Sequence, residues 1–100
     1  MQHNVPCHAD HFEWDEHNMG HLGEHDISPW EVEELYAGGP VWIKDKKTGQ
    51  PDRYQMIGKT SDGRLLTVIV LCKHASRALR AITGWPATEG QKTHYRRRKT

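Results

Sequence analysis

The chain has 100 residues, which corresponds to one domain, and its 27% charged and 35% hydrophobic residues exclude a wholly disordered protein. No apolar run approaches the roughly 20 residues of a membrane span, and the N-terminus lacks the basic and apolar segments of a secretion signal. The net charge of +1 combines nine acidic residues and no Lys or Arg in residues 1–40 with fourteen basic and four acidic residues in 41–100.

Residues 1–11, MQHNVPCHADH, show no hydrophobic period and contain a proline. We therefore expect a flexible N-terminal tail before a single domain over residues 12–100. The two cysteines, Cys7 and Cys72, are too few and too far apart in the sequence for a disulfide framework. Reduced thiols in a cytoplasm are the simpler interpretation, so we expect a cytoplasmic protein.

The segment after the tail predicts a short strand over residues 12–15 and a helix over residues 16–24. Asp15 is the expected N-cap of this helix, because its carboxylate can accept from the first free backbone amides. Gly20 and Gly23 weaken the helix by about 1 kcal/mol each.

A second helix has a clearer signature in the segment ISPWEVEELYAGGP. Ser28 is the expected N-cap, Pro29 takes the first helical position, and Glu31 completes a capping box. The Gly-Gly-Pro of residues 38–40 ends the helix, because glycine suits the turn at a helix C-terminus and proline cannot continue the helix.

Four strands are expected next, over residues 41–44, 53–59, 65–72 and 77–83. The third of them, LLTVIVLC, is the longest apolar run and suits the central strand of a sheet. In the last strand, alternation puts Leu79, Ala81 and Thr83 on one face. Arg80 and Ile82 then share the opposite face.

A final helix is predicted to begin at Thr88, with Gln91 in the capping-box position. Short turns between four sequential strands indicate an antiparallel meander, and helices segregated from these strands make the fold class α+β. The expected order is therefore a strand, two helices, a four-stranded antiparallel meander and a C-terminal helix.

This order of motifs resembles the BrnT-type toxins of bacterial type II toxin–antitoxin modules, which are small RelE-like ribonucleases. The resemblance runs from about Phe12 to Tyr95 and implies a RelE-like fold. It rests on EWDEHN, HLGEHDISPWEVEEL, RYQMIGKTSDGRLLTVIV, RALRAITGWPAT and a tyrosine in the last helix. Trp85-Pro86 stands where many members carry charged residues, so the chain is similar to a less characterised Trp-Pro-Ala branch.

The resemblance implies RNA cleavage without a metal, by attack of a ribose 2′-hydroxyl on the adjacent phosphate. This reaction needs a base, an acid, and cations on the developing phosphorane charge. Arg53 and Arg80 match family arginines and suit the third role, because a guanidinium binds phosphate oxygens bidentately. Tyr95 and His25 also match family positions and are candidates for proton transfer. The alternative is that these four residues are structural, as solvated charges, helix packing or a turn cap.

Further basic residues are candidates for RNA binding. Lys59 and Arg64 flank the predicted hairpin turn, and a basic run near the C-terminus suits phosphate binding. This run comprises Arg96, Arg97, Arg98 and Lys99. The alternative for both groups is ordinary solvated charge. Likewise, the acidic and basic halves of the chain either neutralise each other across the fold or leave one face to meet an anion.

Metal binding is a third interpretation. His17, His21 and His25 recur every four residues, so they stack on one face of a helix, and two stacked histidines can begin a zinc site. Two glycines lie within this stretch and no cysteine is close to it, which disfavours a closed zinc site. We therefore expect no functional metal and no cofactor.

The leading functional prediction is a toxin that acts as a metal-independent RNA endonuclease and is neutralised by a cognate DNA-binding antitoxin. RNA and the antitoxin are then the expected partners, with DNA contacted only through the antitoxin complex and no membrane involved. One alternative is a non-catalytic RNA- or protein-binding module on the same fold. The other is a metal-binding protein that uses the histidine-rich N-terminus.

Overall fold

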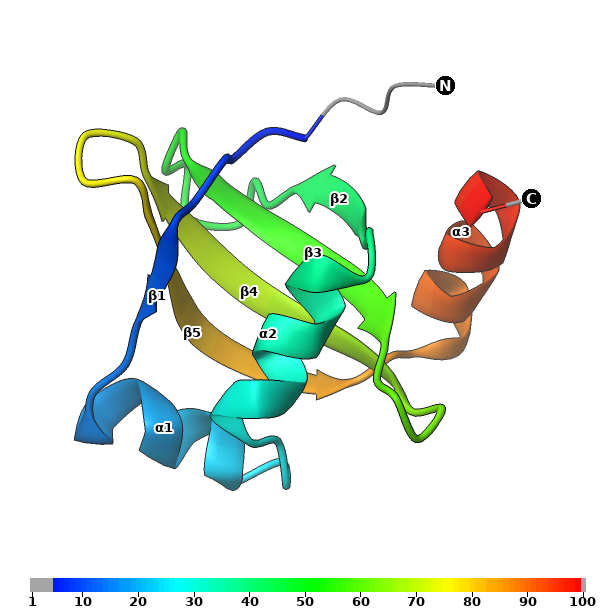
Figure 1. The fold of residues 1–100 in the computed structure, drawn as a ribbon. Coiled ribbons are helices and arrows are strands. Elements are labelled where there is room, and N and C mark those ends of the chain that lie inside the picture. Colours follow the sequence, from blue (N-terminus) through cyan, green and yellow to red (C-terminus); the bar gives the residue numbers. More distant parts are fainter. Residues whose placement is uncertain (1–4, 100) are drawn as a thin grey trace.

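The computed structural model describes residues 5–99, which form a five-stranded sheet and three helices (Figure 1). The strands are β1 (His11–Glu13), β2 (Val41–Lys44), β3 (Arg53–Lys59), β4 (Leu65–Lys73) and β5 (Ala78–Pro86). The helices are α1 (Glu16–Gly23), α2 (Pro29–Ala37) and α3 (Glu89–Lys99). None of the helices in this part of the chain is long and apolar enough to cross a membrane.

The sheet is mixed, with the strand order β1-β5-β4-β3-β2. Strands β2 to β5 pair antiparallel in chain order, whereas β1 pairs parallel to β5 at the edge. The predicted α+β class is confirmed. The RelE-like identity of the fold stays a prediction.

The first two helices begin at the N-cap residues that the sequence predicts. The Asp15 carboxylate accepts from the Asn18 N–H at 3.0 Å, and the Asn18 side chain accepts from the Asp15 N–H at 2.9 Å. At α2 the Glu31 carboxylate accepts from the Ser28 N–H at 3.0 Å. Both predicted N-cap positions are confirmed. The Asp15 carboxylate satisfies an amide that has no partner within the helix, whereas the Ser28 hydroxyl donates to the Glu31 carboxylate at 3.1 Å.

The hydrophobic core lies between one face of the sheet and the pair α1 and α2 (Figure 1). Its fully buried side chains include Leu22, Val32, Leu35, Met56, Leu66, Val68, Val70 and Leu79. Aromatic rings border this core in the order Trp14, Phe12, Tyr36, Trp42 and Tyr54, with successive centroids 5.6 to 6.1 Å apart. Burial of this apolar surface is the main stabilising contribution to the fold.

One buried polar side chain joins α1 to the edge of the sheet. The Asn18 amide donates to the Glu13 carbonyl at 2.8 Å and to the Ala81 carbonyl at 3.0 Å. Asn18 is only 1% exposed, so these bonds replace the water that its amide loses. The helix is therefore fixed to both β1 and β5.

A β-bulge in β5 corrects the predicted alternation of side chains. Val70 pairs with Ala81 and the adjacent Ile69 pairs with Thr83, which leaves Ile82 as an extra residue. Thr83 therefore faces away from Ala81. The prediction was wrong at this position because strict alternation holds only for a regular strand.

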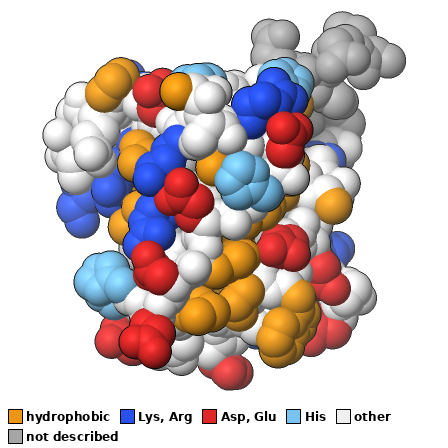
Figure 2. Space-filling model, turned by 60° about the vertical axis from the view of Figure 1, so that its left-hand side comes forward, with side chains coloured by type: hydrophobic (Ala, Val, Ile, Leu, Met, Phe, Trp, Pro, Cys, Tyr) orange, Lys and Arg blue, Asp and Glu red, His pale blue; other side chains and the backbone are white. Residues whose placement is uncertain are grey.

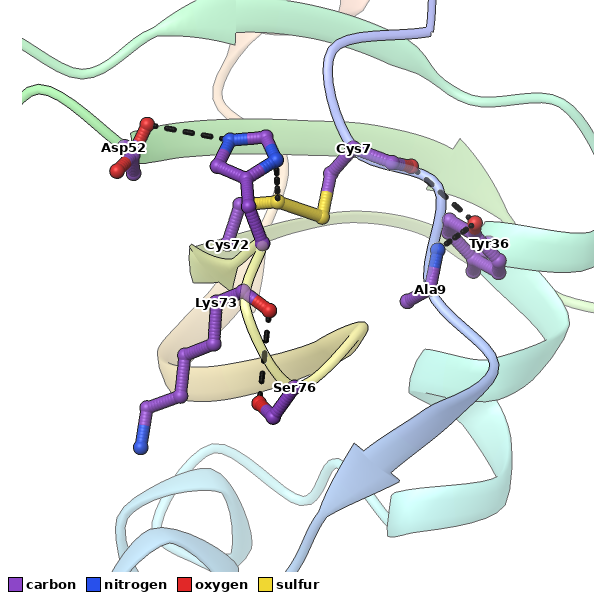
Figure 3. The surroundings of a disulfide bond; sticks show 8 residues. Cys7, Ala9, Tyr36, Asp52, Cys72, Lys73 and Ser76 are labelled. Atoms are coloured by element: carbon purple, nitrogen blue, oxygen red, sulfur yellow. Dashed lines mark hydrogen bonds and ion pairs between the residues drawn. A yellow bond between two sulfur atoms is a disulfide. The ribbon is translucent and has the colours of Figure 1, made fainter.

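Residues 5–11 do not form the flexible tail that the sequence predicts. Cys7 is buried and forms a disulfide with Cys72, with 5.8 Å between their Cα atoms (Figure 3). The Tyr36 hydroxyl accepts from the Ala9 N–H at 3.0 Å and donates to the Cys7 carbonyl at 3.2 Å. The expectation of reduced thiols was wrong, because folding brings together two cysteines that are distant in sequence. The rest of the predicted tail, residues 1–4, lies outside the described residues.

Replacing Cys7 with Ala is expected to lower the thermal stability of the oxidised protein. In the chain-entropy account, a crosslink between residues 65 apart contributes about 4 kcal/mol, so Tm should fall by more than about 10 °C. Calorimetric melts of both proteins without reductant measure this difference. A thiol reductant should lower the Tm of the wild type and leave that of Cys7→Ala unchanged, and equal Tm values would contradict the crosslink.

Gly84 is expected to tolerate no larger residue. A Cβ at this position would lie 3.0 Å from the Thr67 carbonyl oxygen and 3.1 Å from Leu22 Cδ2, so Gly84→Ala should destabilise the protein by about 1–3 kcal/mol. Gly90→Ala is the matched control, because its Cβ meets nothing within 4 Å and alanine favours a helix by about 1 kcal/mol. Urea denaturation of both variants checks the difference. Equal urea midpoints for the two variants would show that Thr67 and Leu22 move aside at no cost and would contradict the prediction.

Candidate nucleic-acid interface

A pocket of about 460 Å³ lies where the turn between β3 and β4 meets α3. It is lined by Lys59, Gly63, Arg64, Leu65, Pro86, Lys92, Tyr95 and Arg96. Four of these side chains are cationic, one is a phenol, and none is an acid or a histidine. This composition suits the phosphate groups of a nucleic acid.

The hairpin between β3 and β4 forms one wall of the pocket. Lys59 and Leu65 are cross-strand partners, and the Thr60 N–H donates to the Arg64 carbonyl at 2.8 Å across the turn. Gly63 has a φ of +91°, which favours glycine, so the Asp-Gly signal for this turn is confirmed. The turn therefore holds Lys59 and Arg64 close to each other at the mouth of the pocket.

Helix α3 forms the other wall, and Gln91 holds it against the sheet. The Gln91 side-chain oxygen accepts from Thr67 Oγ1 at 2.8 Å and from Trp85 Nε1 at 3.2 Å. It also accepts from the Thr88 N–H at 2.9 Å, while Thr88 Oγ1 accepts from the Gln91 N–H at 3.3 Å. The predicted capping box of this helix is confirmed, and the same side chain anchors the helix to β4 and β5.

Lys92, Tyr95 and Arg96 reach the pocket from one face of α3, because residues three and four apart share a helix face. Lys92 is not among the predicted site residues. Its position three residues before Tyr95 and four before Arg96 is the sequence signal that could have identified it. Arg97 and Arg98 are exposed on α3 and do not line the pocket. The predicted basic run therefore contributes one residue to the pocket.

The protein neutralises the cations of the pocket to different degrees. Arg64 Nη1 lies 3.1 Å from Glu31 Oε2. Lys92 meets only the exposed carboxylate three residues before it, at 3.4 Å, and such exposed pairs are weak. Lys59 and Arg96 have no ion-pair partner within residues 5–99. The positive charge available to an anion is therefore greatest at these two side chains.

Arg53 and Arg80 lie in one cross-strand row on the outer face of the sheet, on either side of Leu71. Arg53 Nε lies 2.7 Å from Asp45 Oδ2, and the Asp45 side chain is only 7% exposed. Arg80 Nη1 lies 2.9 Å from Asp15 Oδ2. Figure 2, which views the side that carries β1, shows basic and acidic side chains interleaved. An anion at either arginine must therefore compete with a carboxylate of the protein.

The four predicted catalytic residues are not brought together in one place. Arg53 and Lys59 lie at opposite ends of β3, which separates their Cα atoms by roughly 20 Å at about 3.3 Å per residue. Arg80 shares the row of Arg53, so both lie at the end of the sheet away from Tyr95. His25 is exposed in the turn after α1 and does not line the pocket. Of the four, only Tyr95 lies beside predicted RNA-binding residues.

The histidine-rich segment does not assemble a metal site in the described part of the chain. Within residues 5–99, no group of three or more His, Cys, Asp or Glu side chains is arranged to hold a metal ion. The rings of His17 and His21 lie 4.4 Å apart on α1, as their spacing predicts. His25 lies beyond the end of this helix, and His3 lies outside the described residues.

No family model, curated protein or solved structure matches the chain. The resemblance to BrnT-type toxins therefore rests on sequence motifs alone. The pocket and its charges are the structural basis for a functional proposal.

The ion pair of Arg80 with Asp15 is expected to appear in the pH dependence of stability. The Arg80 guanidinium, together with the Asn18 N–H, lowers the pKa of Asp15 from 3.8 to about 2. A carboxylate with a lowered pKa stabilises the folded state above its unfolded value, and this contribution is lost as the pH falls from about 4 towards 2. In Arg80→Gln, the loss of stability over this range should therefore be smaller than in the wild type.

Urea midpoints measured from pH 5 down to about pH 2 check this expectation. Lys46→Gln is the control, because it removes the same charge from a residue without an ion-pair partner in the described chain. Parallel curves for Arg80→Gln and the wild type would contradict the pairing.

Proposed function

We propose that this chain is a BrnT-type toxin that binds RNA in the pocket between the β3–β4 turn and α3 and cleaves it without a metal ion. The observation that carries the proposal is the convergence of Lys59, Arg64, Lys92 and Arg96 around Tyr95. Two distant segments of the chain supply these side chains, so the fold concentrates positive charge at one place. The volume of about 460 Å³ lies within the usual range of ligand pockets.

The proposed reaction forms a bond from the ribose 2′ oxygen to phosphorus and breaks the bond from phosphorus to the 5′ oxygen. The four cations lower the energy of the phosphorane, whose negative charge exceeds that of the bound phosphodiester. The Tyr95 hydroxyl is the proposed group for proton transfer, because it both donates and accepts hydrogen bonds, unlike the cations around it. Lys59 and Arg96 hold the phosphate, since no carboxylate of the described chain competes for them.

A second candidate is a module that binds RNA without cleaving it. The pairing of Arg53 with Asp45 and of Arg80 with Asp15 favours this candidate, because both predicted catalytic cations are then neutralised by carboxylates of the protein. The pocket also holds one group suited to proton transfer, Tyr95, where the reaction uses a base and an acid.

The proposed antitoxin acts at the same pocket. We propose that its carboxylates cover Lys59 and Arg96 and thereby exclude RNA, and that any contact with DNA belongs to the antitoxin. A cytoplasmic location completes this proposal. The Cys7–Cys72 disulfide weighs against that location, because thiols in most cytoplasms are kept reduced.

Lys59→Gln and Arg96→Gln are each expected to weaken binding of a short labelled RNA. Each removes one phosphate contact, so the slope of log K against log salt should fall by about 0.7 for single-stranded RNA. Fluorescence anisotropy at several salt concentrations, with EDTA present, measures both quantities. Lys46→Gln is the matched control, because Lys46 is exposed in the loop before β3 and lies outside the pocket. Unchanged affinity in both pocket variants would contradict RNA binding at this site.

Tyr95→Phe is expected to separate cleavage from binding. The ring remains and the hydroxyl is lost, so RNA affinity should hold while cleavage falls by about 10²–10⁴-fold. Gel analysis of a defined RNA in EDTA measures cleavage, and anisotropy measures binding on the same preparation. Binding without cleavage by the wild type would support the second candidate, and cleavage that requires a divalent metal would contradict the proposed reaction.

A further inference from the structure

Cys72, His74 and Asp52 form a bonded group at the end of β4 opposite the pocket. His74 Nδ1 lies 3.7 Å from Cys72 Sγ, and His74 Nε2 lies 3.3 Å from Asp52 Oδ1 (Figure 3). The Asp52 carbonyl also accepts from the Cys72 N–H at 2.8 Å, which fixes Asp52 beside this end of the strand. The side chains of His74 and Asp52 are 58% and 44% exposed, so the group borders solvent although Cys72 itself is buried.

The contacts of this group are satisfied by a doubly protonated histidine. A disulfide sulfur carries no proton and can only accept, and the Asp52 carboxylate is likewise only an acceptor. When the imidazole is doubly protonated, both ring nitrogens donate to these acceptors. This form places a positive charge beside Cys72 Sγ, where it stabilises a thiolate when the disulfide opens.

Cys7 lies on an N-terminal segment that a small set of polar contacts holds to the domain. The Tyr36 hydroxyl bonds to the backbone of Cys7 and Ala9, the Asp10 N–H donates to the Arg77 carbonyl at 2.8 Å, and the exposed pair Asp10–Arg77 follows. Among residues 5–10, only Cys7 is fully buried. Because the Cys7 sulfur is buried, an attack on it requires this segment to open locally while the sheet stays folded.

We propose that the Cys7–Cys72 disulfide is an exchange site for a low-molecular-weight thiol, with Cys7 as the attacked sulfur and Cys72 as the leaving group. The incoming thiolate forms a bond to Cys7 Sγ while the bond between the two cysteine sulfurs breaks. The electron pair of the broken bond stays on Cys72 Sγ, with His74 as its counter-ion. The product is a mixed disulfide on Cys7.

A second thiol completes the reduction. Its thiolate attacks the small-molecule sulfur of the mixed disulfide, which releases the Cys7 thiolate to take a proton from water. Two small thiols thus supply two electrons and leave as one oxidised disulfide, while Cys7 and Cys72 are reduced. The direction follows from the position of His74, because the better-stabilised thiolate is the better leaving group.

Other charged groups at this end of the sheet do not compete with His74. They are the ion pairs Lys73–Glu13 and Arg77–Asp10, both at 2.8 Å, the pairs Arg53–Asp45 at 2.7 Å and Arg80–Asp15 at 2.9 Å, and the exposed His8 beside Cys7. Arg77 also lowers the pKa of Asp10, which keeps that pair charged. Within residues 5–99, His74 is the ionisable side chain that contacts Cys72 Sγ.

The test is the rate at which glutathione reduces the oxidised full chain, followed by quenching and alkylation from about pH 5 to 8. Expressed per glutathione thiolate, the rate constant should fall as the pH rises, because a neutral imidazole does not stabilise the Cys72 thiolate by charge. His74→Gln should react roughly tenfold more slowly at the low end and lose this pH dependence. The rate constant of Asp52→Asn should lie between those of the wild type and His74→Gln. His17→Gln, on α1, is the matched control and should react as the wild type does.

Mass spectrometry of the quenched intermediate should find glutathione on Cys7. Glutathione on Cys72, or a pH profile of His74→Gln equal to that of the wild type, would overturn the proposal. Reduction at the rate of global unfolding in every variant would overturn it too, because exchange would then not use local opening. So would freshly purified protein in which both cysteines alkylate without reductant. Circular dichroism checks that the exposed substitutions leave the fold intact.

Discussion

Burial of β4 on both faces is the constraint on which the rest of the structure depends. Its even-numbered residues from 66 to 72 face the core beneath α1 and α2, and on the other face Thr67 meets Gln91 of α3. A strand covered on both sides reads as a near-continuous apolar run, and this one is the longest in the chain. The cationic pocket lies beside Leu65 at one end of the strand, and the disulfide lies at Cys72 near the other.

The opposite charges of the two halves of the chain are matched in part within the fold. Within residues 5–99, five ion pairs join a carboxylate from the first 40 residues to a cation from the remainder: Arg64–Glu31, Lys73–Glu13, Arg77–Asp10, Arg80–Asp15 and Arg80–Glu13. Mutual neutralisation, and not a uniformly basic sheet, therefore accounts for part of the asymmetry. Exposed pairs of this kind contribute less than about 1 kcal/mol each, so their main effect is to decide where an anion meets uncompensated charge. At the pocket beside α3, Lys59 and Arg96 supply such charge without an ion-pair partner in residues 5–99.

Features that depend on neighbouring residues could be predicted from the sequence, and features that depend on distant ones could not. The caps at Asp15, Ser28 and Thr88 rest on contacts three residues apart and are confirmed. The disulfide joins Cys7 to Cys72 across 65 residues, and no local pattern signals it. At the candidate site, charge and spacing identified most of the cations. Which arginines are neutralised depends on tertiary partners, and a single sequence does not show these.

The two walls of the pocket differ in how firmly they are held. No residue of α3 is buried, so the position of this helix rests on polar contacts, chiefly those that Gln91 accepts from Thr67 and Trp85. His94 Nε2 is buried without a hydrogen-bond partner in the described chain, which further lowers the stability of the docked helix. When an anion bridges the hairpin and α3, part of its binding free energy is therefore offset by the cost of ordering the helix. Trp85 Nε1 supplies one of the bonds that hold α3, and therefore Tyr95, beside the hairpin.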